Sequence, residues 1–435
     1  MSNTNRRGFL QQTGANIAGA AALSLTATSR AAGANERVRV GLIGCGGRGR
    51  YDAGVFASRD DAEVAYIADP HKSRLSEAAK EFSGTAKVTD DFRRILDDKS
   101  VDAVIVATPV HWHAPATILA CQAGMHVYVE KPCSHNVREG RLMIEAARRN
   151  NCFVQHGTQV RSTSTIKEGV QLLREGIIGD VLVARAWNIQ RRAGNGQGTL
   201  GDPPAELDFD MWLGPVPKVP YHSTIFSGWN WLRHFGTGEI GNDGIHDIEY
   251  ARWGLGVETH PTMVAAVGGR YLYDNGAEFP DTQQVTFEYP AAGAAKKKIL
   301  IYEERLWSTN YPHNCDSGVE YYGTKGQLFL TRRGKIQVLL DRNKQQPVDV
   351  PLEPQDTGAH VADFLDAIRN NRQPSANAEV AHLTTSLCHL GNITIQSGQS
   401  LSFDPDEERF IDAPEANAML ERTYRDGHWA APKNA

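Results

Sequence analysis

Residues 38–49 read Val-Arg-Val-Gly-Leu-Ile-Gly-Cys-Gly-Gly-Arg-Gly, with Gly44, Gly46 and Gly49 in G-x-G-x-x-G spacing. The glycines follow an apolar strand pattern and open a helical pattern, the context in which this spacing is typical of a dinucleotide-binding turn. Glycine permits a tight turn and a close approach of the backbone to a pyrophosphate at a helix N-terminus. We therefore predict a nucleotide-binding N-terminal domain; an ordinary loop and turn is the weaker alternative.

Apolar strand runs alternate with helical patterns through residues 36–155, as in a parallel sheet built from βαβ units. The predicted strands are 38–43, 64–68, 103–107, 127–129 and 152–155, and the helical stretches between them include 72–82, 114–123 and 137–149. Ligands bind at the carboxyl ends of the strands in such sheets, so the polar motifs that follow these strands form the candidate site.

After about residue 160 the pattern changes to longer alternating strands, at 181–191, 263–273, 284–289, 298–306, 319–322, 328–331 and 336–340. Helical patterns lie at 163–175, 358–370 and 379–397, and a long irregular stretch at 192–236 has a length that is usually functional. The sequence thus predicts an α/β fold: a Rossmann domain with a parallel sheet at 35–158, a C-terminal α/β domain with a large open, mostly antiparallel sheet at 159–400, and a tail at 401–435.

Composition narrows the classes of partner. The 435 residues carry a net charge of −5 with no basic stripe, so we expect no nucleic-acid partner. No apolar run is long enough to span a bilayer, so we expect no stable membrane insertion. The six cysteines form no C-x-x-C pair, and neither a disulfide pattern nor a cysteine metal site is predicted.

The first 34 residues have the three parts of a twin-arginine export signal. Arg6 and Arg7 precede a weakly apolar middle, and Ala32-Gly33-Ala34 supplies a cleavage site before Asn35. We expect the protein to use the twin-arginine export machinery and to be periplasmic or otherwise exported. The alternative is a disordered tail with incidental arginines.

Asp69 is the acid that accompanies the glycine loop. It lies twenty residues after Gly49, in Ile-Ala-Asp-Pro at the end of the second predicted strand. A carboxylate there accepts hydrogen bonds from ribose hydroxyls and repels a 2′-phosphate, so NAD is favoured over NADP. A simple turn residue is the alternative for Asp69.

Two further motifs point to proton chemistry. Glu130-Lys131-Pro132 follows a strand at the ligand edge, where a lysine can meet a hydroxyl or a nicotinamide ribose. Asn242 and His246 lie four residues apart, on one face of a predicted α-helix. Histidine is a natural base for an alcohol proton, although a helix-capping region with a satisfied histidine is the alternative.

His111 and His113 follow the strand at 103–107 and are read as a polar cluster at the start of a helix. A metal site there lacks a third ligand at a useful spacing, so no metal is expected.

Together these motifs resemble the Gfo/Idh/MocA family, of glucose-fructose oxidoreductase and inositol dehydrogenase type, over residues 38–400. The resemblance rests on Gly44–Gly49, Asp69, Thr108-Pro109 with His113, Glu130-Lys131-Pro132, His246 and Tyr322-Gly-Thr-Lys-Gly-Gln-Leu. It implies a nicotinamide-dependent oxidoreductase acting on a hydroxyl of a sugar, cyclitol or glycoside. It also implies a homodimer or homotetramer assembled through the open sheet.

The resemblance assigns roles to particular residues. Lys131 positions the substrate hydroxyl and cofactor ribose, His246 is the acid/base, and Asn242 completes the catalytic set. The implied cofactor contacts are Gly44, Cys45, Gly46, Gly47, Arg48, Gly49, Asp69, Thr108, Pro109, His113, Glu130, Lys131 and Gln159. The implied substrate contacts are Arg161, Trp229 and Asp243, although tryptophan more often packs in a core.

Asn242 departs from the family pattern, which commonly has aspartate four residues before the histidine. An amide holds a hydroxyl but supplies no charge, and Asp243 points about 100° away from Asn242 on an α-helix.

Three functions remain open. The leading one is an exported NAD-dependent sugar or cyclitol dehydrogenase. The second is a glycoside hydrolase that oxidises, eliminates and re-reduces with a tightly bound NAD, which suits a compartment without a free NAD pool. The third is a sugar-sensing or scaffold protein that keeps the cofactor site.

Overall fold

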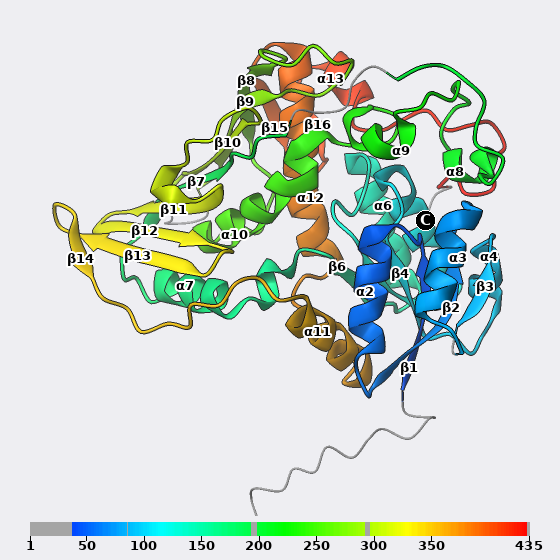
Figure 1. Ribbon diagram of the computed structural model, residues 1–435. Helices are drawn as coiled ribbons and strands as arrows, with labels where there is room; N and C mark the ends of the chain where they lie inside the picture. The colour runs from blue at the N-terminus through cyan, green and yellow to red at the C-terminus, as the bar shows by residue number, and fades with distance from the viewer. Residues whose placement is uncertain (1–36, 85, 193–197, 292–295, 433–435) are drawn as a thin grey trace, which may run out of the picture. The chain divides into compact units, whose positions relative to one another are not determined.

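A six-stranded parallel sheet forms the N-terminal domain of the computed structural model, which describes residues 37–84, 86–192, 198–291 and 296–432 (Figure 1). The strand order is β3-β2-β1-β4-β5-β6, and every neighbouring pair is parallel. The strands are β1 (Val38–Ile43), β2 (Ala62–Ala68), β3 (Lys87–Thr89), β4 (Ala103–Val106), β5 (His126–Val129) and β6 (Val154–His156). The predicted Rossmann sheet is confirmed, with β3 as an additional strand. The predicted export signal at 1–34 lies outside the described residues.

Helices from both halves of the chain pack on this sheet. Those between its strands are α2 (Gly47–Ala57), α3 (Lys72–Glu81), α4 (Arg93–Asp97), α5 (His113–Gln122) and α6 (Val137–Arg149). A late helix, α11 (Thr357–Arg369), lies beside α2 in Figure 1. Its Phe364 meets the rings of Phe56 and Tyr128 edge-on, so the C-terminal half of the sequence completes the Rossmann core.

A ten-stranded sheet forms the second domain, in the order β14-β13-β12-β11-β7-β10-β9-β8-β15-β16. Its strands are β7 (Val181–Asn188), β8 (Met263–Gly269), β9 (Thr282–Tyr289), β10 (Lys298–Arg305), β11 (Ser317–Gly323), β12 (Gly326–Thr331), β13 (Lys335–Leu340), β14 (Lys344–Gln346), β15 (Leu401–Asp404) and β16 (Arg409–Phe410). The β7–β10 pair is parallel and the other pairs are antiparallel, so the predicted mostly antiparallel sheet is confirmed.

Helices cover one face of this sheet: α7 (Ser164–Arg174), α10 (Ile245–Leu255) and α12 (Ala378–Ser397). Alternate residues of β9, including Val285, Phe287 and Tyr289, are buried against this layer. The long α12 also contacts α6 and β6, so it joins the two sheets through shared packing.

Residues 401–435, expected as a tail, supply β15, β16 and the short helix α13 (Pro414–Ala418). β15 pairs with β8 at one edge of the second sheet. This segment therefore contributes to the fold of the C-terminal domain. Phe403 and Phe410 are almost fully buried in the C-terminal core.

The irregular stretch at 192–236 contains two short helices, α8 (Phe209–Leu213) and α9 (Ile225–Gly228), around a small core of its own. The remaining short helices are η1 (Val110–Trp112), η2 (Gln159–Ser162), η3 (Trp229–Trp231), η4 (Ile240–Gly244) and η5 (Pro312–Asn314). Within the described residues, no helix combines the length and apolar character needed to cross a membrane.

Candidate active site

A cavity of about 290 Å³ opens at the carboxyl ends of β1, β2, β4 and β5. Among the predicted site residues, its lining includes Gly44, Gly46, Gly47, Arg48, Asp69, Thr108, Pro109, His113, Glu130, Lys131, Trp229 and Asn242. Motifs spread over some two hundred residues of sequence thus meet at one edge of the parallel sheet, where such sheets bind ligands.

The glycine loop leaves no room for side chains where the chain turns from β1 into α2. Gly44 has a φ of +98°, and a Cβ there would lie 2.7 Å from the carbonyl oxygen of Ala107. A Cβ on Gly49 would lie 2.0 Å from the carbonyl oxygen of Gly44, so the first turn of α2 packs directly on the loop. The N-terminus of α2 therefore faces the cavity, which fits the pyrophosphate of a dinucleotide.

Asp69 closes the end of β2 and lines the same cavity. Its Oδ2 accepts a hydrogen bond from the Cys45 amide at 2.7 Å, and its Oδ1 accepts one from the His71 amide at 2.8 Å. Burial raises the pKa of the carboxyl, and these two amides oppose that shift. The carboxylate is held in a fixed orientation, which fits recognition of ribose hydroxyls.

The Lys131 side chain extends from the end of β5 to the C-terminal domain. The peptide bond between Lys131 and Pro132 is cis. The Lys131 ammonium donates to the backbone oxygen of Asn242 and, at 3.2 Å, to the Asn242 side-chain oxygen. Burial lowers the pKa of Lys131, and the carboxylate of Glu130 opposes this shift. Glu130 itself is paired with Arg48 at 2.8 Å.

His113 connects two strand ends. Its ring nitrogens lie 2.6 Å from the carbonyl oxygen of Pro132 and 2.8 Å from that of Thr108. Burial lowers its pKa. In this position His113 fixes the turn that carries Lys131, in addition to lining the cavity.

The segment before His246 is a π-helical turn, Ile240–Gly244, that runs into α10. The expectation of regular α-helical spacing between Asn242 and His246 is therefore wrong, because i→i+5 bonding widens this turn. Single π turns inside helices are frequent at functional sites.

His246 is buried beside this turn. Its Nδ1 has no hydrogen-bond partner among the described residues. Burial lowers its pKa, and the positive charges of Arg332 and Lys131 lower it further. The imidazole is therefore neutral near pH 7 and free to accept a proton.

Asp243 points toward the second sheet, where it joins a polar network. Arg332, just after β12, donates to its Oδ1 at 2.9 Å, and Asn188 at the end of β7 donates to its Oδ2 at 3.0 Å. Although burial opposes it, Arg332 holds the pKa of Asp243 well below its usual range. A substrate that contacts Asp243 as predicted would thus compete with the ion pair between Asp243 and Arg332.

Two buried carboxyls near the site were not found from the sequence. Glu239 accepts a hydrogen bond from the Asn242 side-chain nitrogen at 3.0 Å and pairs with Arg192 at 2.9 Å. Burial raises its pKa to about 7, opposed by Arg192. Burial likewise raises the pKa of Asp247 to about 7. Glu239 and Asp247 both lie in the glycine-rich run around His246, and this run was the sequence feature that could have pointed to them.

Six predicted residues lie outside the cavity lining: Cys45, Gly49, Gln159, Arg161, Asp243 and His246. The Cys45 side chain is buried, with its thiol near the Ala68 carbonyl. Gln159 bonds Tyr128 and Gln355, and Arg161 pairs with Glu249 and lies over Trp253. These side chains support the walls of the site.

Residues 204–214, here called the strap, cross the loop that follows β2. Lys72 donates its amide to the Glu206 carbonyl at 2.9 Å, and the Asp208 amide donates to Pro70 at 3.0 Å. The Trp212 carbonyl accepts bonds from the rings of His111 and Trp112, each at 2.9 Å. The strap therefore covers the cavity next to Asp69.

The end of the chain holds the strap from its other side. Arg425 donates to the Asp210 carboxylate at 2.5 Å and to the Gly214 carbonyl at 2.6 Å. Trp429 packs against Phe92 and Trp112, both of which line the cavity.

Comparison with known families assigns both domains. Residues 38–158 match the model described as oxidoreductase family, NAD-binding Rossmann fold, and residues 183–431 match the oxidoreductase family C-terminal alpha/beta domain. The expected NAD-binding character of the Rossmann domain is confirmed.

Individual relatives match the chain to different extents. The scyllo-inositol 2-dehydrogenase (NAD(+)) of Bacillus subtilis (strain 168) is 25% identical over 351 residues, which is 78% of this chain and 88% of that protein. A glycosyl hydrolase family 109 protein of Shewanella sp. (strain W3-18-1) is 28% identical over 213 residues, 43% of this chain and 46% of that protein. Levoglucosan dehydrogenase, in complex with NADH and levoglucosan, shares the fold with a TM-score of 0.66 and 20% identity over 84% of this chain and 99% of that chain.

Proposed function

Because the chain belongs to the Gfo/Idh/MocA oxidoreductase family, we propose that it is an NAD-dependent dehydrogenase for a hydroxyl of a sugar, a cyclitol or a glycoside. The observation that carries this proposal is the contact between Lys131 and the Asn242 turn in the cavity lining. This turn leads directly into α10, where Nδ1 of His246 has no hydrogen-bond partner among the described residues. The relative that acts on a cyclitol supports the substrate class.

The residues fit bound NAD in defined places. The glycine loop and the N-terminus of α2 hold the pyrophosphate, and Asp69 holds the adenosine ribose. The chemistry that NAD supplies when bound is acceptance of a hydride from the carbon that bears the reacting hydroxyl.

Proton handling belongs to the protein. Lys131 donates a hydrogen bond to the substrate hydroxyl and orients it, exchanging its present bonds to Asn242. Neutral His246 accepts the hydroxyl proton as a general base. Asp243, paired with Arg332, gives the charged imidazolium a nearby counter-ion after transfer.

The test is the reduction of NAD in the presence of free inositols or monosaccharides, which is measured as the absorbance of the reduced nicotinamide. We expect Lys131→Met and His246→Asn each to lower kcat by about 10²- to 10⁴-fold, the typical value of acid–base catalysis. Lys80→Met, which changes an exposed lysine on α3, is the matched control. Equal turnover in all four proteins would refute the assignment.

A redox-neutral glycoside hydrolase is the second candidate, favoured by the similarity to glycosyl hydrolase family 109 proteins. In this reading NAD returns to its oxidised state within each turnover. Release of a chromogenic aglycone with no net change in reduced nicotinamide supports the hydrolase, whereas stoichiometric NADH with a free sugar supports the dehydrogenase.

We further propose that the cofactor stays bound during export, and that the twin-arginine segment exports the loaded protein. The strap, held by Arg425, supports retention because it lies over the adenosine side of the cavity. The test is native mass spectrometry of protein from the periplasm and from the cytoplasm. A periplasmic form lacking NAD(H), or the absence of the protein from the periplasm, would overturn this proposal.

A further inference from the structure

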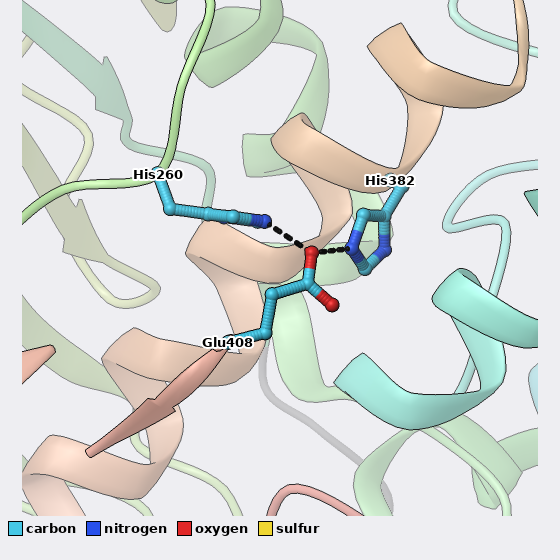
Figure 2. Close-up of side chains that lie close together, drawn as sticks. All are labelled: His260, His382 and Glu408. Atoms are coloured by element: carbon cyan, nitrogen blue, oxygen red, sulfur yellow. Dashed lines mark hydrogen bonds and ion pairs between the residues drawn. The ribbon is translucent and has the colours of Figure 1, made fainter. Parts of the chain in front are cut away.

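Two histidines and a glutamate meet in the C-terminal domain, at a place separate from the cavity lining (Figure 2). His260 lies between α10 and β8, His382 lies on α12, and Glu408 lies in the turn between β15 and β16. Three segments that are far apart in sequence therefore direct side chains to one point.

The three donor atoms converge closely. Nε2 of His260 and Nε2 of His382 lie 2.8 and 2.7 Å from Oε1 of Glu408, and all three atoms lie within 4.8 Å of one another. The imidazole planes are inclined by 85°, so the nitrogens approach from different directions. The histidines are 3% and 0% exposed, so neither ring is a mobile surface group.

We propose that His260, His382 and Glu408 bind a divalent zinc ion. Two neutral imidazole nitrogens and one carboxylate oxygen are a ligand set that zinc uses, with water in the fourth position. The ion replaces the proton on each Nε2, and each ring remains neutral with its proton on Nδ1. Each Nε2 lies 2.7–2.8 Å from Oε1 of Glu408. A small outward shift of each ligand atom makes room for a zinc ion bonded to all three at about 2.0–2.1 Å.

The contacts of Glu408 fit a ligating carboxylate that has an outer-shell partner. Oε1 receives three donors, the two imidazoles and Arg141 at 2.5 Å, whereas Oε2 receives only Arg141 at 3.2 Å. Binding of the ion at Oε1 leaves Arg141 on Oε2, the outer-shell contact that orients a ligating carboxylate. Nδ1 of His382 lies 3.5 Å from the Ser386 hydroxyl, an outer-shell partner for the second ring.

Glu408 also gives water access to the proposed zinc site from the surface. Its side chain is 12% exposed and borders a surface cavity lined by Val137, Arg138, Glu407 and Asn417. The ion would connect the β15–β16 turn to α12 and to the loop before β8. Because such a site is absent from the unfolded chain, its binding energy stabilises the fold.

The experiment uses the full chain without a histidine tag, stripped with a chelator and then titrated with Zn²⁺ or Co²⁺. Metal content is measured by mass spectrometry, and Co²⁺ geometry by visible absorption. Glu408→Gln is the decisive variant, because the amide oxygen still accepts both imidazole N–H groups but is a poor zinc ligand. His382→Asn removes a nitrogen ligand, and Arg141→Gln removes the guanidinium while leaving all three ligands.

For wild-type protein we expect one zinc ion per chain and a rise in Tm on zinc addition. Arg141→Gln keeps all three ligands, so we expect the same stoichiometry with a lower affinity, because an outer-shell contact is lost. We expect binding at least roughly tenfold weaker in Glu408→Gln and His382→Asn, since even outer-shell changes cost 10- to 100-fold in metal affinity. His246→Asn, at the other site, should bind zinc normally. NAD binding by Glu408→Gln shows that this variant is folded.

Two results would overturn the proposal. One is wild-type protein that takes up neither Zn²⁺ nor Co²⁺ at micromolar concentration. The other is equal uptake by wild type and Glu408→Gln, which would place the metal elsewhere and identify the cluster as a hydrogen-bonded ion pair.

Discussion

Glu239 places an ionisable group directly behind Asn242, where the family commonly has an acid at the 242 position itself. Its carboxyl bonds the Asn242 amide, which in turn contacts Lys131. Because burial raises its pKa from 4.5 to about 7, Glu239 ionises near neutral pH rather than in acid. The charge missing at Asn242 is thus supplied one turn earlier in the chain.

We predict that kcat rises between pH 6 and 8 as Glu239 ionises and stabilises the Lys131 ammonium. Glu239→Gln keeps an acceptor for Asn242 but carries no charge, so its profile should lose the step near pH 7. A pH–rate series on both proteins checks this. An unchanged step in the variant would assign it to another group, with Asp247 the next candidate.

Asp69 should control the choice of cofactor. Removing its charge in Asp69→Asn weakens hydrogen bonds to the ribose, and charged hydrogen bonds contribute about 1.5–3 kcal/mol. We expect the KM for NAD to rise roughly tenfold or more and the preference for NAD over NADP to decrease. Steady-state kinetics with both cofactors measure this, with the exposed Asp97→Asn as control. An unaltered NAD-to-NADP ratio would contradict the role of Asp69.

Some site residues were predictable because the signal is local. Gly44, Asp69 and Lys131 each lie within two residues after a strand, so parallel pairing brings them to one edge. The partners of Asp243 were not predictable, since Asn188 ends β7 and Arg332 follows β12, and no spacing relates them to Asp243. The resemblance implies a substrate contact for Arg161, and the structure adds an ion pair with Glu249 that no sequence spacing predicts.

Among the elements, β1 and α6 were predicted to the residue, whereas the strands predicted at 181–191 and 263–273 end earlier, at Asn188 and Gly269. β3 was not, because Lys87–Thr89 has three residues, two of them exposed, and therefore no apolar pattern. The π turn at Ile240–Gly244 was also missed, because residue preferences do not distinguish it from an α turn. At this turn Lys131 of the Rossmann domain donates a hydrogen bond to the Asn242 carbonyl, a contact between residues that are far apart in sequence.

The strap makes a prediction at the level of one element. Arg425→Gln removes its bonds to Asp210 and Gly214, which should loosen the strap and release NADH roughly tenfold faster. Stopped-flow fluorescence of bound NADH measures the rate. Arg333→Gln, which breaks an exposed pair with Asp316, is the control. Identical release rates would mean that the strap does not retain the cofactor.

Across the whole molecule, the late segment joins the two domains. Glu408 binds Arg141 of α6, and Arg422 pairs with Glu139 of the same helix at 2.6 Å. Phe403 and Phe410 contribute to the C-terminal core and meet edge-on at 5.2 Å. Removing contacts of this segment should therefore lower the stability of the protein as a unit.

We expect Phe403→Ala to lower the free energy of unfolding by about 3–5 kcal/mol, the cost of a large buried aromatic. Ile411→Ala, at a side chain that is 51% exposed beside Phe410, should change it by less than about 0.5 kcal/mol. Urea unfolding followed by tryptophan fluorescence compares them. A similar small effect for both would show that β15 and β16 are dispensable.

The anchoring of the strap by Arg425 and Trp429 also has a consequence for biosynthesis. A ribosome completes the parallel sheet long before these residues emerge, and domains fold in order as they are made. Because α11, which completes the Rossmann core, emerges before Arg425 and Trp429, the nascent domain presents an uncovered cleft between these two events. Covering of the nucleotide is then one of the last events in maturation, so cellular NAD abundance at that moment would set the fraction of molecules that mature loaded.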